Sequence, residues 1–326
     1  MRVISVEPLT GITFRKPGPF GLTQRGPLSV SSTYFMKTTT LLGLLAYTKY
    51  SEDPSCAEAP EELPLGFSAL ASCLPCRPLR GPYASVRSQL YFGEERPFNL
   101  SALLELWEKG LKEEVEGLAE GRKVLEDGEG LMDYYAKSPD FERVSIISNK
   151  LDRRTKRSAF VFVRERLIMS GVEFFFEEEG CGGVREGVYA LGSDGGLARV
   201  RRKPSNPVEG ALKELWGERW GEPGAKATVV AVSPIILGFK DPHDPRSHWK
   251  GALRDAAPVR LFSRYEVELH PLGWDMKRNC PRPFAPAIKP GSAVVGTLEV
   301  SPEELYWRGV GELAELGFGS VLPLPM

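Results

Sequence analysis

The spacing of apolar and polar residues predicts a mixture of short strands and helices along this chain. Residues 3–14 are rich in β-branched side chains with loose alternation, which predicts an N-terminal strand. After a stretch rich in proline and glycine, residues 38–47 predict a helix whose threonines can supply the N-cap. Because that helix is apolar on nearly every side, we expect it to be buried.

The central part of the chain changes from helical to strand-like spacing. Residues 53–97 are rich in proline and cysteine, and we expect an irregular insertion there, within a larger insertion over residues 53–140. Leucine and tryptophan then recur at helical spacing over residues 100–126. Antiparallel strands are predicted at residues 144–148, 160–163, 167–169 and 172–176, including a basic β-hairpin near 150–176, and a second hairpin over 189–200 turns at Asp194 and Gly195.

Residues 204–224, with a short predicted helix at 208–220, form a candidate domain boundary. Beyond it, strands are predicted at residues 227–232, 259–262, 265–269 and 292–300. A helix begins at Pro302, with Ser301 as its N-cap and two acidic residues in its first turn, and extends to residue 316. This order predicts an α+β fold with antiparallel sheets, divided into residues 1–205 and residues 206–326.

The composition is that of a globular protein with balanced charge. The chain has 326 residues, 42% of them hydrophobic, and its 42 Lys and Arg against 43 Asp and Glu give a net charge of −1. The length fits two domains, and the charge gives no overall basic footprint. No apolar run approaches the ~18 residues that a membrane helix needs, and the N-terminus lacks signal-peptide features, so we expect a cytoplasmic protein. Four asparagines and two glutamines favour a thermophilic source.

Cys73 and Cys76 form a lone C-x-x-C pair. A zinc site needs four ligands, and no second pair stands at a usual spacing, although Cys181, Cys280 or a distant histidine is available. A structural thiol pair or a disulfide is the simpler interpretation, and we expect no metal and no cofactor.

The three histidines, at positions 243, 248 and 270, form no recognisable catalytic motif. His243 and His248 lie with two aspartates in residues 241–248, where two prolines favour a solvated loop over a metal site or an acid–base pair. Residues 36–39 resemble half of a phosphate-binding loop without its glycines, and the helix start that follows can still bind a single phosphate.

Local basic clusters near aromatic residues point to RNA. Residues 150–157 hold five cations and one acid, Arg164 and Arg166 follow, and residues 199–203 form a second cluster. Cations contact phosphates, and phenylalanines such as those at 160, 162 and 174–176 stack on unpaired bases. The alternative is that these phenylalanines are sheet core and the cations a solvated turn. Near the C-terminus, Gly317 and Gly319 either cap a helix or let the backbone approach a ligand or another element closely.

Several segments together resemble one family. They are residues 7–9, 14–20, 38–45, 191–200, 272–275, 281–292 and the Gly-Phe-Gly-Ser of residues 317–320. Together they are similar to the RAMP-superfamily subunits of the type III-B CRISPR effector, the Cmr complex, and among these to the third-numbered subunit. The resemblance extends over nearly the whole chain through short motifs, and residues 53–97 have no counterpart in it.

That resemblance implies two ferredoxin-like (RRM-like) modules with insertions, and a protein that is not an enzyme. A member of this family holds the repeat-derived 5′ tag of the crRNA, and it docks the large polymerase/cyclase-like subunit beside the backbone RAMP subunits in antiviral defence. On this sequence it implies RNA contacts at the first helix start, the basic loop, the Gly-Trp-Asp motif and the glycine-rich segment. The residues are Lys37, Thr38, Thr39, Thr40, Lys150, Arg153, Arg154, Lys156, Arg157, Trp274, Lys277, Gly317, Gly319 and Ser320. For Trp274, a core or interface position is the alternative to base stacking.

Other functions stay open at this point. The chain can be the corresponding subunit of a type III-A (Csm) or type III-D assembly, a crRNA-processing RAMP endoribonuclease, or an adaptor that contacts only proteins. The nuclease is disfavoured because such relatives often place a histidine near the first helix, whereas no histidine precedes position 243 here. Holding an RNA end needs phosphate contacts and stacking rather than a group of shifted pKa.

Overall fold

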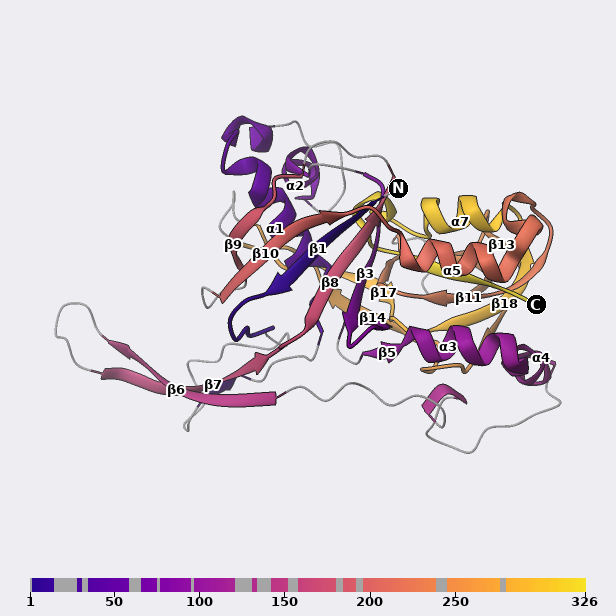
Figure 1. Ribbon diagram of the computed structural model, residues 1–326, viewed down its shortest axis with the longest axis horizontal. Helices are drawn as coiled ribbons and strands as arrows, with labels where there is room; N and C mark the ends of the chain where they lie inside the picture. Colours follow the sequence, from indigo (N-terminus) through magenta and orange to yellow (C-terminus); the bar gives the residue numbers. More distant parts are fainter. Residues whose placement is uncertain are drawn as a thin grey trace.

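The computed structural model of this chain contains two main sheets that pack into one body, with a long two-stranded ribbon projecting from it (Figure 1). It describes residues 2–14, 28–30, 35–58, 66–74, 77–94, 97–120, 131–133, 142–151, 158–179, 184–191, 196–238, 245–275 and 280–326. Helices and antiparallel sheets occur together, which confirms the mixed α and β architecture.

A seven-stranded antiparallel sheet forms the centre of the N-terminal half, in the order β5-β4-β3-β8-β1-β10-β9. Its strands are β1 Arg2–Pro8, β3 Leu79–Val86, β4 Gln89–Phe92, β5 Phe98–Asn99, β8 Val172–Glu178, β9 Gly187–Leu191 and β10 Gly196–Lys203. The strand expected at the N-terminus and the hairpin near residues 189–200 are confirmed. The irregular insertion expected over residues 53–97 is wrong, because β3 and β4 lie there and β3 pairs with both β4 and β8. Pro82 made this strand hard to recognise from the sequence, because proline cannot donate a hydrogen bond to a neighbouring strand. In the structure, Pro82 lies where the β3–β8 register shifts between Arg80 and Tyr83.

Helices and strands pack on both faces of this sheet, and they leave part of one face, at β10, exposed. Helix α1 (Thr38–Tyr50) covers one face, where its leucines pack against Ile4, Val6 and Phe174. The opposite face packs on helix α3 (Leu100–Leu106) and on the C-terminal half. The helix predicted over residues 100–126 is interrupted after α3 by a π-helical turn, η3 (Trp107–Leu111), in which Gly110 has φ 108°, and it resumes as α4 (Lys112–Ala119).

The C-terminal half contains a four-stranded antiparallel sheet in the order β13-β18-β11-β19, and two smaller sheets, β12-β17-β14 and β15-β16. Its elements are α5 Pro207–Trp216, η5 Gly217–Gly221, β11 Lys226–Ala231, β12 Ile235–Ile236, α6 Pro245–His248, β13 Leu253–Val259, β14 Val267–Pro271, β15 Trp274–Asp275, β16 Cys280–Pro281, β17 Phe284–Ile288, β18 Ala293–Leu298, α7 Pro302–Arg308, η6 Ala314–Leu316 and β19 Val321–Pro325.

Two expectations in this half need correction. The strand expected at residues 259–262 lies earlier, at Leu253–Val259. The helix expected over residues 302–316 does begin after the Ser301 N-cap, whose side chain accepts from the backbone amide of Glu304, but it ends at Arg308. Gly309 and Gly311, with φ of 68° and 86°, turn the chain away, and only the short 3-10 segment η6 follows.

The projecting ribbon consists of β6 (Glu142–Leu151) and β7 (Ser158–Ile168), paired antiparallel, and β2 (Leu28–Val30) pairs with β7 in parallel (Figure 1). The two strands expected at residues 160–163 and 167–169 are therefore one continuous strand. Ile12 bridges Leu167 and joins the base of the ribbon to the end of β1. A further short element is the 3-10 turn η4 (Leu131–Asp133).

Both hydrophobic clusters contain residues from both sides of the predicted boundary. One joins Val3 and Phe175 to Val229 and Leu322, and the other joins Ile4 to Ala285 and Phe318. The two parts share both hydrophobic clusters. The division of the chain into two modules at residues 205 and 206 stays a prediction.

A buried carboxylate connects the two parts. Glu177 on β8 is fully buried, and its Oε1 and Oε2 accept the backbone amides of Val208 (2.6 Å) and Glu209 (3.1 Å) at the start of α5. The hydroxyl of Tyr306, on α7, donates to the same carboxylate. Burial raises the pKa of Glu177 to about 7, although these three hydrogen bonds act in the opposite direction.

We expect the ionisation of Glu177 to lower the free energy of unfolding as the pH rises. Its pKa is about 7 in the fold and 4.5 in an exposed glutamate, so the folded state binds the proton more tightly. Ionisation therefore lowers the free energy of unfolding as the pH rises from about 4.5 to about 7, by up to about 3 kcal/mol. Glu177→Gln does not titrate, so its stability relative to wild type should rise by that amount across this range in urea denaturation. A difference that is constant with pH would contradict the expectation.

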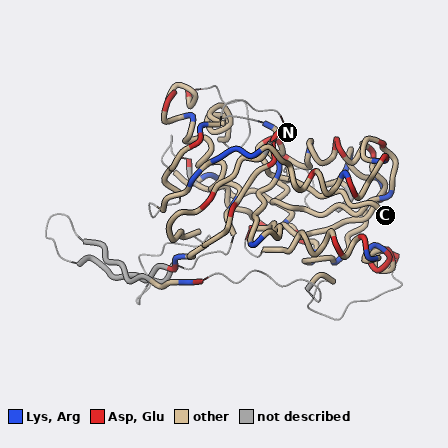
Figure 2. The backbone as a smooth tube through the Cα atoms, viewed as in Figure 1, with Lys and Arg blue, Asp and Glu red and all other residues tan. Residues whose placement is uncertain are grey.

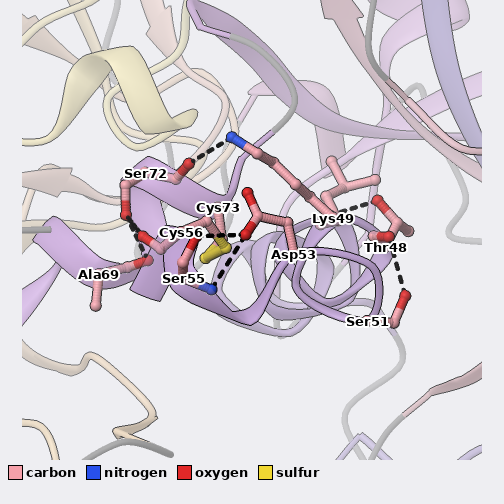
Figure 3. The surroundings of a disulfide bond; sticks show 10 residues. Thr48, Lys49, Ser51, Asp53, Ser55, Cys56, Ala69, Ser72 and Cys73 are labelled. Carbon is pink, nitrogen blue, oxygen red and sulfur yellow. Dashed lines mark hydrogen bonds between the residues drawn. A yellow bond between two sulfur atoms is a disulfide. The ribbon is translucent and has the colours of Figure 1, made fainter. Parts of the chain in front are cut away.

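A disulfide joins the segment after α1 to the next helix. It links Cys56, in the 3-10 turn η1 (Pro54–Glu58), to Cys73 at the end of α2 (Ser68–Cys73) (Figure 3). The pairing of Cys73 with Cys76 considered from the sequence is therefore wrong, and Cys76 lies outside the described residues. Lys49 Nζ donates to the carbonyl of Ser72 (3.0 Å), which ties α2 to α1 as well.

Removing this disulfide should destabilise the chain. It closes a loop of 17 residues, and a loop of that length contributes about 3 kcal/mol by restricting the unfolded chain. The double variant Cys56→Ala/Cys73→Ala should lose about that much in chemical denaturation. Cys280→Ala is the matched control, because Cys280 is an exposed free cysteine, and it should leave the free energy of unfolding unchanged. Equal stability of both variants would contradict the expectation.

Candidate nucleic-acid interface

The start of α1 is covered by a carboxylate from the same chain. Its N-cap is Lys37, whose side chain makes no capping hydrogen bond, so the expectation of a threonine N-cap is wrong. Instead the backbone amide of Thr38 donates to Oε1 of Glu94 (2.8 Å), a residue that is 4% exposed. The carboxylate meets the positive end of the helix dipole, for which the first turn supplies no acid.

The Gly-Trp-Asp motif lies beside this helix start. A Cβ atom on Gly273, whose φ is +81°, would stand 3.4 Å from the Cβ atom of Thr39. Trp274 pairs with Pro281 in the small β15-β16 sheet. Nearby, the guanidinium of Arg282 lies 4.6 Å from the ring centroid of Phe67, and its Nε donates to the carbonyl of Gly66 (3.4 Å). Residues 272–275 and residues 37–40, far apart in the sequence, are therefore neighbours.

His270 links the helix start to the glycine-rich segment. Its Nε2 lies 3.6 Å from Oε2 of Glu94, and its ring is 6.5 Å from the ring of Phe318. Among the described residues neither His270 Nε2 nor Thr38 Oγ1 has a hydrogen-bond partner. Sequence reasoning missed Glu94, which lies in the stretch expected to be irregular, and no spacing pattern connects it to His270.

The glycine-rich segment is buried under the chain's own atoms. Gly317, with φ 90°, ends η6, and a Cβ there would stand 2.9 Å from the ring of Phe176. Gly319, with φ 58°, approaches Val310 so closely that a Cβ would stand 1.8 Å from its carbonyl oxygen. Both alternatives considered for these glycines thus apply: one ends a helical turn, and both let the backbone approach another element.

Ser320 and Arg80 bind this segment to β3. Ser320 Oγ donates to the carbonyl of Gly317 (3.0 Å) and accepts the amide of Gly81 (3.1 Å). The guanidinium of Arg80 donates to the carbonyl of Ala314 (2.7 Å), and burial lowers its pKa to about 10. The proposed RNA contacts of Gly317, Gly319 and Ser320 stay predictions, and in this structure all three residues are buried.

In the sequence, most of the predicted basic loop lies between the β6 and β7 strands of the ribbon. Lys150 pairs with Phe160 in the β6–β7 register, whereas Arg153, Arg154, Lys156 and Arg157 lie outside the described residues, as does Lys277. Of the aromatic residues considered for stacking, those at positions 174–176 are buried in the two cores, so their interpretation as sheet core is confirmed.

The structure describes only the end of the histidine-containing loop, residues 245–248. His243 lies outside the described residues, and His248, in α6, has its Nδ1 2.9 Å from the hydroxyl of Tyr265. Within the ranges given above, no group of three or more His, Cys, Asp and Glu side chains is placed to hold a metal ion. In the same ranges, no helix combines the length and the apolar character needed to cross a membrane.

Comparison with solved structures shows which fold the chain has. No family model and no curated protein matches the chain. A chain in the cryo-EM structure of the type III-B Cmr-beta bound to cognate target RNA is 16% identical with a TM-score of 0.56, and the match covers 90% of this chain and 86% of that one. This chain has the fold of that Cmr-beta chain. A chain in Cmr-beta bound to cognate target RNA and AMPPnP, state 1, is 14% identical with a TM-score of 0.55 and the same coverage.

Two glycines offer a test of the packing around this interface. Gly319→Ala should lower the free energy of unfolding by about 3 kcal/mol, because the new methyl group would meet the carbonyl of Val310 at a positive φ. Gly43→Ala, in the exposed middle of α1 with nothing within 4 Å, should instead raise it by about 1 kcal/mol. Chemical denaturation measures both, and a neutral Gly319→Ala would contradict the close approach.

Proposed function

We propose that this chain is a non-catalytic RNA-binding subunit of a type III CRISPR effector. In its specific form the proposal is a type III-B (Cmr) subunit that holds the 5′ tag of the crRNA and bridges to the large polymerase/cyclase-like subunit and the backbone RAMP subunits. The observation that carries it is the fold shared over 90% of this chain with a chain of the RNA-bound Cmr-beta. The short motifs of the sequence support the same conclusion independently.

The ribbon supports an RNA-holding role. It projects beyond the body of the protein (Figure 1). In the sequence, four cations stand between β6 and β7, and cations can contact a phosphate backbone in a way that positions RNA without reading its bases. The near-zero net charge of the chain does not exclude such RNA contacts, because the cations are concentrated in a few segments of the sequence.

The absence of catalysis is part of the proposal. His270 is 6% exposed, its Nε2 lies 3.6 Å from Oε2 of Glu94, and its ring is 6.5 Å from that of Phe318. A general base must reach within hydrogen-bond distance of the proton that it abstracts, so this imidazole would need the surrounding chain to move first. We propose that it helps to order the helix start.

Purification from native cells tests the proposal. RNA with a shared repeat-derived 5′ end and a large partner subunit should accompany the protein. Cleavage of repeat RNA by the isolated chain without added metal, abolished by His243→Ala, would establish the nuclease instead. Co-purification of proteins without RNA would establish the adaptor, and co-purification with type III-A or III-D subunits would reassign the complex.

The basic loop can be tested by its salt dependence. Replacing Arg153, Arg154, Lys156 and Arg157 with Glu should weaken binding of tag RNA. Each lost phosphate contact should lower the slope of log affinity against log salt by about 0.7. Fluorescence anisotropy at several salt concentrations measures both quantities. An unchanged slope would remove this loop from the interface.

A further inference from the structure

The open part of the seven-stranded sheet carries a stripe of cations. Arg199, Arg201 and Lys203 alternate along β10, and side chains at alternate positions of a strand share one face. Ala198 and Val200, on either side of Arg199, pack in the cluster that contains α1. The three cations therefore face away from α1, and Figure 2 shows Lys and Arg positions as a blue run along the end of β10.

This stripe is accessible to solvent. On the same side of the sheet, Tyr83 and Phe175 are covered by the C-terminal half, which leaves the β10 and β9 strands open. The side chains of Arg199, Arg201 and Lys203 are 37%, 49% and 44% exposed.

Exposed apolar side chains lie at one end of the stripe. Leu197, two residues before Arg199 on the same face, is 42% exposed, and Val188, opposite Arg199 on β9, is 52% exposed. Leu9 is 39% exposed, and its amide donates to the carbonyl of Leu197 (2.8 Å). We call these three apolar residues and the three cations the β10 face.

The carboxylates on this face hold the cations weakly. Glu7 lies 3.1 Å from Arg199 and 3.8 Å from Arg201, and Glu173 pairs with Lys203. The carboxylate of Glu186 also lies beside the stripe, where it accepts the backbone amide of Arg202 (2.7 Å), so the three cations stand among three carboxylates. Ion pairs this exposed contribute little, whereas an arginine binds phosphate through two parallel hydrogen bonds, so phosphates can displace the carboxylates.

The β10 face is continuous with the base of the ribbon. The amide of Leu197 donates to Thr10 Oγ1 (2.9 Å), and two residues further on Ile12 exchanges backbone hydrogen bonds with Leu167 of β7. Between them, a Cβ on Gly11 would stand 3.5 Å from the Cβ atom of Arg166. Thr10, Gly11 and Ile12 therefore connect β10 to the base of the ribbon, so one strand of RNA can contact both.

We propose that the β10 face binds single-stranded RNA that continues from the ribbon. Alternate residues of a strand are about 7 Å apart, so the three cations can contact phosphates along an extended chain. Leu197, Val188 and Leu9 offer an apolar surface to unpaired bases, and the contact is tolerant of sequence because every base has an apolar face. The inference rests on the proposed function and assigns it a second contact surface.

A charge-matched pair of variants tests this. The triple variant Arg199→Gln/Arg201→Gln/Lys203→Gln removes the stripe. The control Lys109→Gln/Lys226→Gln/Arg308→Gln removes three exposed, ion-paired cations from η3, β11 and α7. The probe is fluorescein-labelled oligouridylate of about 20 nucleotides, measured by anisotropy across a salt series. The stripe variant should bind at least tenfold more weakly than the control at low salt, and its salt slope should be smaller by about 2.

The outcomes separate the two proposals. If wild type binds no RNA, the proposed function and this inference both fail. If wild type binds and the two variants are equal, only the β10 face is overturned, and the same holds if the stripe variant loses a protein partner but no RNA affinity. Photocrosslinking of wild type to 4-thiouridine RNA does not depend on the folding of the variants. Crosslinks should map to residues 187–203, and crosslinks confined to other segments would overturn the inference.

Discussion

The buried carboxylate of Glu177 is the interaction on which the arrangement of the two parts depends. It lies on a central strand, yet it accepts hydrogen bonds from the first amides of α5 and from a tyrosine of α7. An uncompensated carboxylate in this position would be costly, so the three donors must be brought to it. The same contacts hold the start of α5 against β8, and both hydrophobic clusters extend across residues 205 and 206.

A second buried carboxylate, that of Glu94, accepts a backbone amide at a helix start in the candidate interface. Glu94 comes from the segment after β4 and covers the start of α1, while His270 and Phe318 come from the C-terminal half. A helix start that bound phosphate directly would need its amides free, whereas here one of them is already occupied by a carboxylate. Under the proposed function, this arrangement favours RNA contacts through the ribbon and the β10 face over contacts with the helix amides themselves.

Local charge and net charge have separate consequences in this protein. Acids and bases balance over the whole chain, and many exposed cations are paired with carboxylates. Under the proposed function, association with RNA would rely on the few positions where cations are concentrated, and the affinity would then depend strongly on salt.

Local patterns in the sequence determined the elements with strong periodicity or clear caps: β1, α1, the β9–β10 hairpin and the start of α7 at Ser301. They also marked the segments that converge on the interface, because glycine, proline and tryptophan at fixed spacing are visible without a structure. Only tertiary structure decided that Cys73 pairs with Cys56, that β3 lies at the centre of a sheet despite Pro82, and that α7 stops at Arg308. It also decided that Glu94 covers α1. These contacts join residues distant in the chain, and their energies come from burial, which no local pattern records.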